Sequence, residues 1–250
     1  MKTEFATETR CLPKTLQQRK DAPAGKRNYQ HEMDVIIAGY SGVQEASGRT
    51  GSLRRSAPAR DDPGLKEDEK PRLLLHSCCG PCSSSVLEDL SRYFRITLFW
   101  YNPNIWPQEE FDRRLAAQKK LLQAMDPSGR IALLEIPREA EVWYRAAAGL
   151  EREPEGGLRC TECFRLRLRE AAKAAADGGF DWYCSTLTLS RHKDPIRINA
   201  LGEQYGREYG VRWLPSEFKK HGRELRSKEL CEKFGIYRQN YCGCEYSKLS

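Results

Sequence analysis

The pattern of apolar and polar positions changes near residue 71. Residues 1–70 contain 3 of the 24 aromatic residues, and Gly, Ser, Pro and charged residues dominate positions 41–70. Such a segment buries too little apolar surface to offset the entropy lost on ordering it. We therefore predict a disordered or weakly ordered N-terminal extension over residues 1–70. Its one apolar run, residues 33–40 (MDVIIAGY), is a candidate stray strand or docking segment.

Beyond residue 71, short apolar runs alternate with segments of helical period. The runs with strand character are 72–77, 96–101, 131–137, 181–185 and 211–215. The segments with helical period are 83–94, 108–125, 139–149, 159–177, 196–209 and 227–234. Strands that alternate with helices indicate a parallel sheet. We predict an α/β domain over residues 71–250, with a five-stranded parallel sheet covered by helices on both faces.

Composition bears on the compartment and on the role of the cysteines. The run at residues 33–40 is too short to cross a bilayer. No apolar segment follows a basic N-terminal region, so we expect no secretory signal, no membrane association and a cytoplasmic protein. In a reducing compartment, the 10 cysteines are better explained by metal binding or redox chemistry than by structural disulfides.

Seven of the cysteines form three clusters. These are Cys78-Cys79-Gly80-Pro81-Cys82, Cys160-Thr161-Glu162-Cys163 and Cys242-Gly243-Cys244. The first lies between a predicted strand and a helix N-terminus, where free N–H groups favour thiolates. Soft thiolates bind zinc or iron–sulfur centres, and seven exceed what one tetrahedral zinc or one cubane takes. The surplus indicates a second metal, a redox-active pair, or both.

Three isolated cysteines and the charge distribution are less specific. Cys184 and Cys231 are interpreted as structural, and Cys11 lies in the extension. Residues 190–250 carry 13 basic and 8 acidic side chains, with basic and aromatic residues interleaved from Lys219 to Tyr241. This excess is consistent with a surface for nucleic acid and equally with a solvated lysine-rich face.

Four long motifs carry a resemblance to a known family. They are LLLHSCCGPCSS, EPEGGLRCTECFRLRL, DWYCSTLTLSRHKD and GIYRQNYCGCEYS. In these motifs, which span residues 72–247, the chain resembles the QueH-type epoxyqueuosine reductases. The resemblance implies reduction of the epoxide of epoxyqueuosine at the tRNA wobble position to give queuosine, without cobalamin. It also implies a fold like that of the HUP/PP-loop superfamily, a [4Fe–4S] cluster beside an additional iron, and an external electron donor such as ferredoxin or flavodoxin.

The resemblance also implies roles for single residues. It assigns the [4Fe–4S] cluster to Cys78, Cys79, Cys160 and Cys163. It leaves Cys82, Cys242 and Cys244 as catalytic ligands of the additional iron, with a redox-active disulfide as the alternative role of the last two. The chain departs from the family pattern at Trp106, where we expect histidine, and at Arg191-His192, where Pro-Tyr is usual.

The reaction also needs protons, and the candidate donors are His76, Glu110, Asp194 and Tyr241. An anticodon loop would present the base, because proteins read single-stranded loops specifically. Two alternatives are a PP-loop tRNA thiolase, which would carry an SGGxDS loop in place of HSCCGPCSS, and a non-catalytic zinc-thiolate RNA-binding module. A metal-free thiol redox protein using Cys160 and Cys163 leaves the other clusters unexplained.

Overall fold

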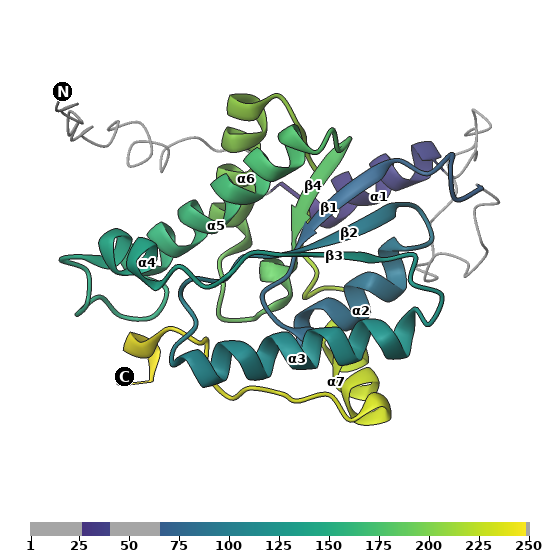
Figure 1. Cartoon of the computed structure of the whole chain (residues 1–250). Coiled ribbons are helices and arrows are strands. Elements are labelled where there is room, and N and C mark those ends of the chain that lie inside the picture. Colours follow the sequence, from purple (N-terminus) through teal and green to yellow (C-terminus); the bar gives the residue numbers. More distant parts are fainter. Residues whose placement is uncertain (1–26, 41–65, 249–250) are drawn as a thin grey trace, which may run out of the picture.

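The computed structural model describes residues 27–40 and 66–248 as helices packed around one sheet (Figure 1). The strands are β1 (Arg72–His76), β2 (Arg95–Trp100), β3 (Ala132–Glu135), β4 (Trp182–Ser185) and β5 (Arg212–Trp213). The α-helices are α1 (Tyr29–Tyr40), α2 (Gly80–Leu90), α3 (Gln108–Met125), α4 (Ala140–Ala147), α5 (Leu158–Asp177), α6 (Pro195–Tyr209) and α7 (Arg223–Phe234). Two short 3₁₀ turns, η2 (Thr186–Leu189) and η3 (Glu245–Ser247), complete the described elements.

The sheet is parallel throughout, with the strand order β3-β2-β1-β4-β5. In its register, Leu75 of β1 lies opposite Leu98 of β2 and Cys184 of β4. The chain builds outward from β1 to β3 and then returns to add β4 on the other side of β1. Ligands of such sheets bind beyond the carboxyl ends of the strands where the order reverses. In this sheet that place lies beyond the carboxyl ends of β1 and β4.

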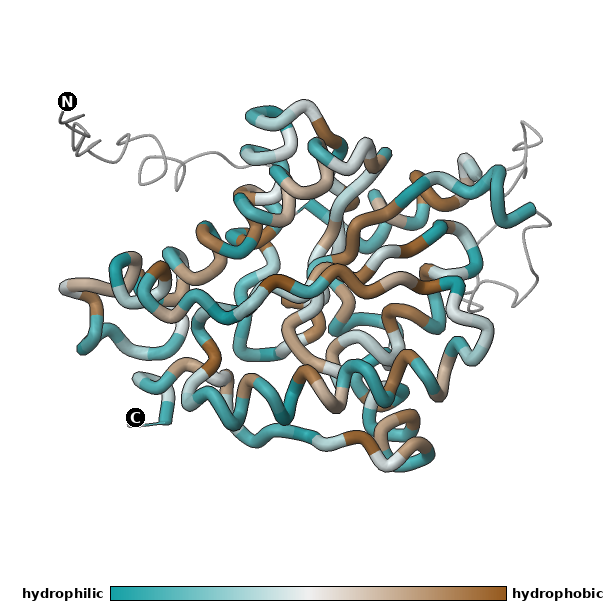
Figure 2. The backbone as a smooth tube through the Cα atoms, viewed as in Figure 1, coloured by the Kyte–Doolittle hydropathy of each residue, from teal (hydrophilic) through white to brown (hydrophobic). Residues whose placement is uncertain are grey.

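Helices cover both faces of the sheet, which confirms the predicted α/β architecture. α2 contacts α3 and α7, whereas α5 contacts α4 and α6, and Figure 1 shows these two groups on opposite sides of the strands. Strand β1 is central and apolar because both of its faces are buried, and Leu73, Leu74 and Leu75 are 0% exposed. Figure 2 shows the same central strands in brown, between helices that carry teal on their outer sides.

The predicted disorder of residues 1–70 is wrong for helix α1. Met33, Ile36, Ile37 and Tyr40 recur at helical spacing and pack into or against the main core. The indole N–H of Trp182 donates to the Tyr40 hydroxyl at 2.8 Å. A helical docking segment therefore replaces the stray strand as the structure of this run. The rest of the extension, residues 1–26 and 41–65, lies outside the described residues.

No helix within 27–40 or 66–248 combines the length and apolarity that a membrane span requires.

Candidate metal centre

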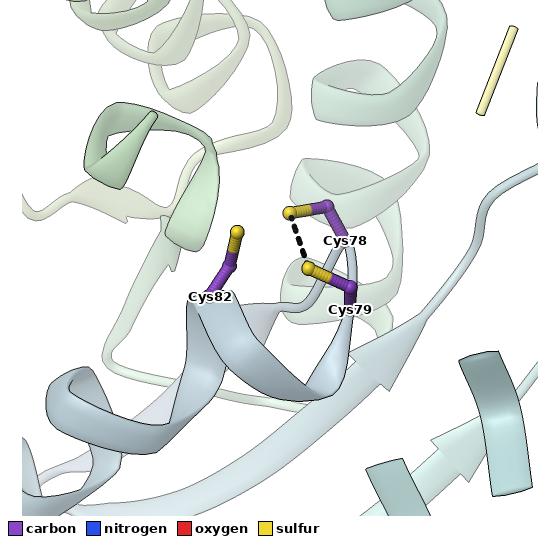
Figure 3. A group of neighbouring side chains, drawn as sticks. All are labelled: Cys78, Cys79 and Cys82. Atoms are coloured by element: carbon purple, nitrogen blue, oxygen red, sulfur yellow. Dashed lines mark hydrogen bonds between the residues drawn. The ribbon is translucent and has the colours of Figure 1, made fainter. Parts of the chain in front are cut away.

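Three thiols gather where β1 ends and α2 begins. The Sγ atoms of Cys78, Cys79 and Cys82 all lie within 4.8 Å of one another, and Figure 3 shows them gathered there. Cys79, in an extended conformation, is the N-cap residue of α2, which places Cys82 in the first turn. A Cβ on Gly80 would lie 3.3 Å from the carbonyl oxygen of Ala117 in α3. The small residue therefore lets the thiol-bearing turn pack closely against that helix.

Hydrogen bonds among the three thiols favour a single thiolate on Cys78. Those from Cys79 and Cys82 lower the pKa of Cys78 well below its usual range, although burial opposes this change. The hydrogen bond to Cys78 raises the pKa of Cys79 to about 12, and hydrogen bonds to both neighbours raise the pKa of Cys82. The N-terminus of α2 favours the same negative charge. A soft, partly anionic donor set of this kind fits zinc or iron.

Four more thiols line a small second cavity, between the start of α5 and the C-terminal segment. They are Cys160, Cys163, Cys242 and Cys244. Cys163 and Cys244 are 6% and 7% exposed, and the Gly156 N–H donates to the Cys160 sulfur at 3.2 Å. Burial raises the pKa of Cys244 to about 12. The described cysteines, including Cys242 and Cys244, are free thiols in this structure.

The two thiol groups adjoin. Cys242 lines the small cavity and also a larger one of about 410 Å³, which Cys78 and Cys82 line as well. That volume is in the range of ligand sites, roughly 300–1,000 Å³. Proximity alone groups Cys82 with Cys78 and Cys79, whereas the resemblance groups Cys78 and Cys79 with the C-x-x-C of α5. The ligand assignment from the resemblance therefore stays a prediction.

Two cations, the buried Arg167 and the partly exposed Lys193, face the thiols. Arg167 is 2% exposed and donates to the Cys163 sulfur at 3.7 Å and to Asn102 Oδ1 at 2.6 Å. Lys193 lines both cavities, and although burial lowers its pKa, the nearby thiols, Cys78 foremost, raise it on balance. Among the described residues, no carboxylate forms an ion pair with either cation. Buried charges need a partner of opposite sign, so this centre is built for thiolates or another anionic group.

Two buried polar atoms at the larger cavity also lack partners. Asn104 Oδ1 and Gln239 Oε1 form no hydrogen bond within the described part of the chain. The amide nitrogen of Gln239 donates to the Cys79 sulfur at 2.8 Å, which holds its oxygen beside the first thiol group. Since buried acceptors are normally satisfied, these two oxygens are available to a bound ligand that carries hydroxyl or N–H groups.

Of the four candidate proton donors, only Tyr241 lines the larger cavity. His76 is fully buried, and burial lowers its pKa to about 3, so it is a neutral structural residue. Glu110 is paired with Arg114 at 2.6 Å, and Asp194 accepts from the backbone as the N-cap of α6. The structure therefore provides no support for these three as acids.

Several basic residues of the C-terminal region form ion pairs with carboxylates. The pairs are Lys219 and Lys220 with Glu217, Arg223 with Asp89, and Arg226 with Glu88. Two of these pairs join α7 to α2, so part of the basic excess holds the fold together. The sequence interpretation of this run as an RNA-binding surface therefore overestimated its free charge.

The isolated cysteines lie where a structural role predicts. Cys184 is 0% exposed in β4, and Cys231 is 2% exposed in α7. The Cys184 thiol donates to the Leu214 carbonyl at 3.2 Å, and burial raises its pKa to about 12. Neither cysteine lines the two cavities, and Cys11 lies outside the described residues.

At the positions that depart from the family pattern, Trp106 is exposed, Arg191 pairs with Glu224, and His192 lines both cavities. Sequence reasoning missed other functional candidates, namely Asn104, Arg167, Lys193 and Gln239. The only signal for them was their position. Each lies in a quoted motif or in the turn after the second strand, near a cysteine cluster or the carboxyl end of a strand.

Together these features define a doubly wound α/β protein with a thiol-rich, cation-lined centre at the carboxyl edge of its sheet. A family model described as "Epoxyqueuosine reductase QueH" matches residues 73–250. The chain belongs to this family.

Curated relatives named epoxyqueuosine reductase QueH agree with this assignment. The protein of Staphylococcus epidermidis is 41% identical over 188 residues, which cover 74% of this chain and 79% of the relative. The Streptococcus pyogenes protein is 40% identical over 184 residues, covering 73% and 72%. The Thermotoga maritima protein is 32% identical over 177 residues, covering 71% and 90%.

Proposed function

We propose that this chain is an oxidoreductase that converts epoxyqueuosine at the wobble position of tRNA to queuosine. The epoxide takes up two electrons and two protons, an alkene forms, and the oxygen leaves as water. One observation carries the proposal: in a chain of this family, six of the seven clustered cysteines line two adjoining cavities at the carboxyl edge of the sheet, and the seventh, Cys79, lies within 4.8 Å of Cys78 and Cys82. The family match favours neither the PP-loop thiolase nor the zinc-thiolate module.

The donor set fits an iron–sulfur cofactor, because close thiols and unpaired cations meet at one place. By resemblance, a [4Fe–4S] cluster takes the four cysteines Cys78, Cys79, Cys160 and Cys163. Cys82, Cys242 and Cys244 remain for an additional iron or, in the last two, a redox-active pair. When bound, such a centre supplies electrons and Lewis acidity. Ferredoxin or flavodoxin is the proposed external donor, and the cytoplasm is the proposed compartment.

The protein's own groups bind and enclose the substrate. The wobble base leaves the anticodon loop and enters the larger cavity, since chemistry on a base requires access to it outside the stack. There Asn104 Oδ1 and Gln239 Oε1 accept hydrogen bonds from substrate hydroxyl or N–H groups. Arg167 and Lys193 keep their positive charge beside the thiols and compensate negative charge at the centre.

The direct test starts with iron and acid-labile sulfide in anaerobically purified protein, with absorption spectra before and after dithionite. We expect about four to five irons and about four sulfides per chain, and bleaching on reduction. Reduced protein should then convert epoxyqueuosine-containing tRNA to queuosine tRNA. Zinc without sulfide in protein from iron-replete cells, and no conversion, would refute the reductase in favour of the zinc-thiolate module.

The ligand assignment has its own test in single cysteine-to-serine variants. If the resemblance holds, C160S loses sulfide and cluster iron, whereas C82S keeps about four sulfides and loses about one iron. Loss of sulfide in C82S would instead place Cys82 among the cluster ligands, as its position near Cys78 and Cys79 allows. C231S is the matched control, since Cys231 is buried away from both cavities, and its metal content should be unchanged.

A further inference from the structure

Trp106 differs from every other tryptophan of the chain. It is 37% exposed, whereas Trp100, Trp143, Trp182 and Trp213 are each 8% exposed or less. A single exposed apolar side chain is ordinary in a folded protein. Evidence for a functional role of Trp106 therefore has to come from its position and its neighbours.

The backbone of Trp106 is held by the segment that carries Cys242 and Cys244. Its N–H donates to the Gly243 carbonyl at 2.8 Å, and its carbonyl accepts from the Tyr241 hydroxyl at 2.6 Å. Gly243 has a φ of +105°, and a Cβ there would lie 2.7 Å from the Arg114 guanidinium. The positive φ favours glycine at this position, and the two hydrogen bonds hold the two segments against each other. Trp106 thus has a defined place beside the metal centre.

That place is the rim of the larger cavity. Ile105, the preceding residue, and Tyr241, whose hydroxyl donates to the Trp106 carbonyl, both line the cavity, and Trp106 borders them with 37% of its side chain exposed. Lys248 Nζ is 5.8 Å from the Trp106 ring centroid and 5.4 Å from that of Tyr241. Lys248 forms no ion pair with a carboxylate of residues 27–40 or 66–248. An exposed aromatic ring beside a cation with no ion-pair partner among those residues is the combination that binds single-stranded nucleic acid by stacking and charge.

We propose that Trp106 stacks on a nucleobase adjacent to the modified nucleotide when that nucleotide occupies the larger cavity, with Lys248 near the phosphate between them. This inference rests on the proposed function. A wobble base that enters the cavity leaves its neighbour without a stacking partner, and the indole at the rim replaces that partner. Stacking uses the π-face common to all bases, so Trp106 contributes affinity and positioning with little sequence preference.

Intrinsic fluorescence tests the inference without any redox chemistry. The ligands are an anticodon stem–loop with guanine at the wobble position and the same hairpin made abasic at either flanking nucleotide. Because the other four tryptophans are buried, quenching on binding should come from Trp106, and W106F should abolish it. W106A should bind the intact hairpin about 5- to 150-fold more weakly, with W106F closer to the wild type.

The abasic hairpins supply the coupling measurement. The wild type should bind one of the abasic hairpins as weakly as W106A binds the intact hairpin. W106A should bind that abasic hairpin and the intact hairpin with equal affinity. L225A is the control, since Leu225 is 63% exposed on α7 and should be neutral. Unquenched fluorescence, or equal affinities of W106A and wild type, would overturn the stacking role.

Turnover separates this inference from the proposed function. In iron-loaded enzyme, W106A should raise KM for epoxyqueuosine tRNA while kcat stays close to the wild-type value. If the wild type turns over and W106A has an unchanged KM, the function stands and the stacking role is wrong. If the wild type does not convert this tRNA, the proposed function fails, and hairpin binding still decides whether Trp106 stacks on RNA.

Discussion

Replacing Met33 with alanine tests whether helix α1 is an integral part of the domain. The Met33 side chain is 0% exposed and belongs to the main core, although it lies outside the family match at residues 73–250. Truncation of a buried methionine costs about 2–5 kcal/mol, because the transfer free energy is lost and a cavity remains. We expect M33A to lower the free energy of unfolding by about 2–4 kcal/mol.

The free energy with which α1 docks on the domain sets an upper limit on the stability that M33A can lose. An isolated helix of 12 residues is marginal in water, so α1 depends on its tertiary contacts. Besides the core packing, these include the hydrogen bond from Trp182 to Tyr40 and an ion pair between Arg27 and Glu203 at 2.8 Å. Exposed ion pairs contribute little, so apolar burial dominates. If truncation costs more than docking provides, α1 detaches and the loss stops at the docking free energy.

Urea denaturation measures the change, and hydrogen exchange of residues 29–40 reports detachment directly. V35A is the matched control, because Val35 is on the same helix and 58% exposed. Iron content and kcat should be unchanged in M33A, because α1 contacts Trp182 at the start of β4 and the thiols lie beyond the carboxyl ends. Equal stabilities of M33A and V35A would refute the docking of α1.

Two further predictions concern stability and metal binding. Burial acts to raise the pKa of Asp126, but hydrogen bonds from Ser128 and the Ile131 N–H lower it on balance. Its contribution to stability is therefore present above the usual carboxyl pKa and is lost as pH falls through the lower folded pKa. D126N should cost about 1–3 kcal/mol in urea melts at pH 7. A stability gap between the two proteins that does not narrow as the pH is lowered from 7 into the acid range would contradict this. C184A should lose about 1–2 kcal/mol yet keep its full iron and sulfide, and a variant depleted of iron would show that Cys184 belongs to the centre after all.

The sequence by itself predicted the local structure well. The helix expected at residues 108–125 is α3, Gln108–Met125, and all five strands begin and end close to their predicted bounds. Hydrophobic period and turn residues are local properties, so they can be read from neighbouring positions. Ligands bind at the carboxyl edge of a parallel sheet, and this rule predicted that the first cysteine cluster follows a strand end. The thiols of Cys78 and Cys79 lie there in the structure, directly after β1.

The helix at residues 29–40 shows the limit of composition. The flanking polar sequence predicted disorder, yet four apolar side chains at helical spacing were enough to bind the segment to the core. Whether such a short run finds a complementary apolar surface depends on residues such as Phe94 and Trp182, which are distant in the chain. Composition averages over a window and does not contain that information.

The candidate site was determined partly by the sequence and partly by the tertiary structure. The sequence determined which residues carry the chemistry, because thiol clusters at helix starts and near the chain end are visible as motifs. Only the tertiary structure decided that Cys242 lines both cavities, that Arg167 and Lys193 face the thiols without carboxylate partners among the described residues, and that basic residues of α7 are paired with α2. These relations join positions far apart in sequence, and they depend on how the helices pack on the sheet, which no local pattern specifies.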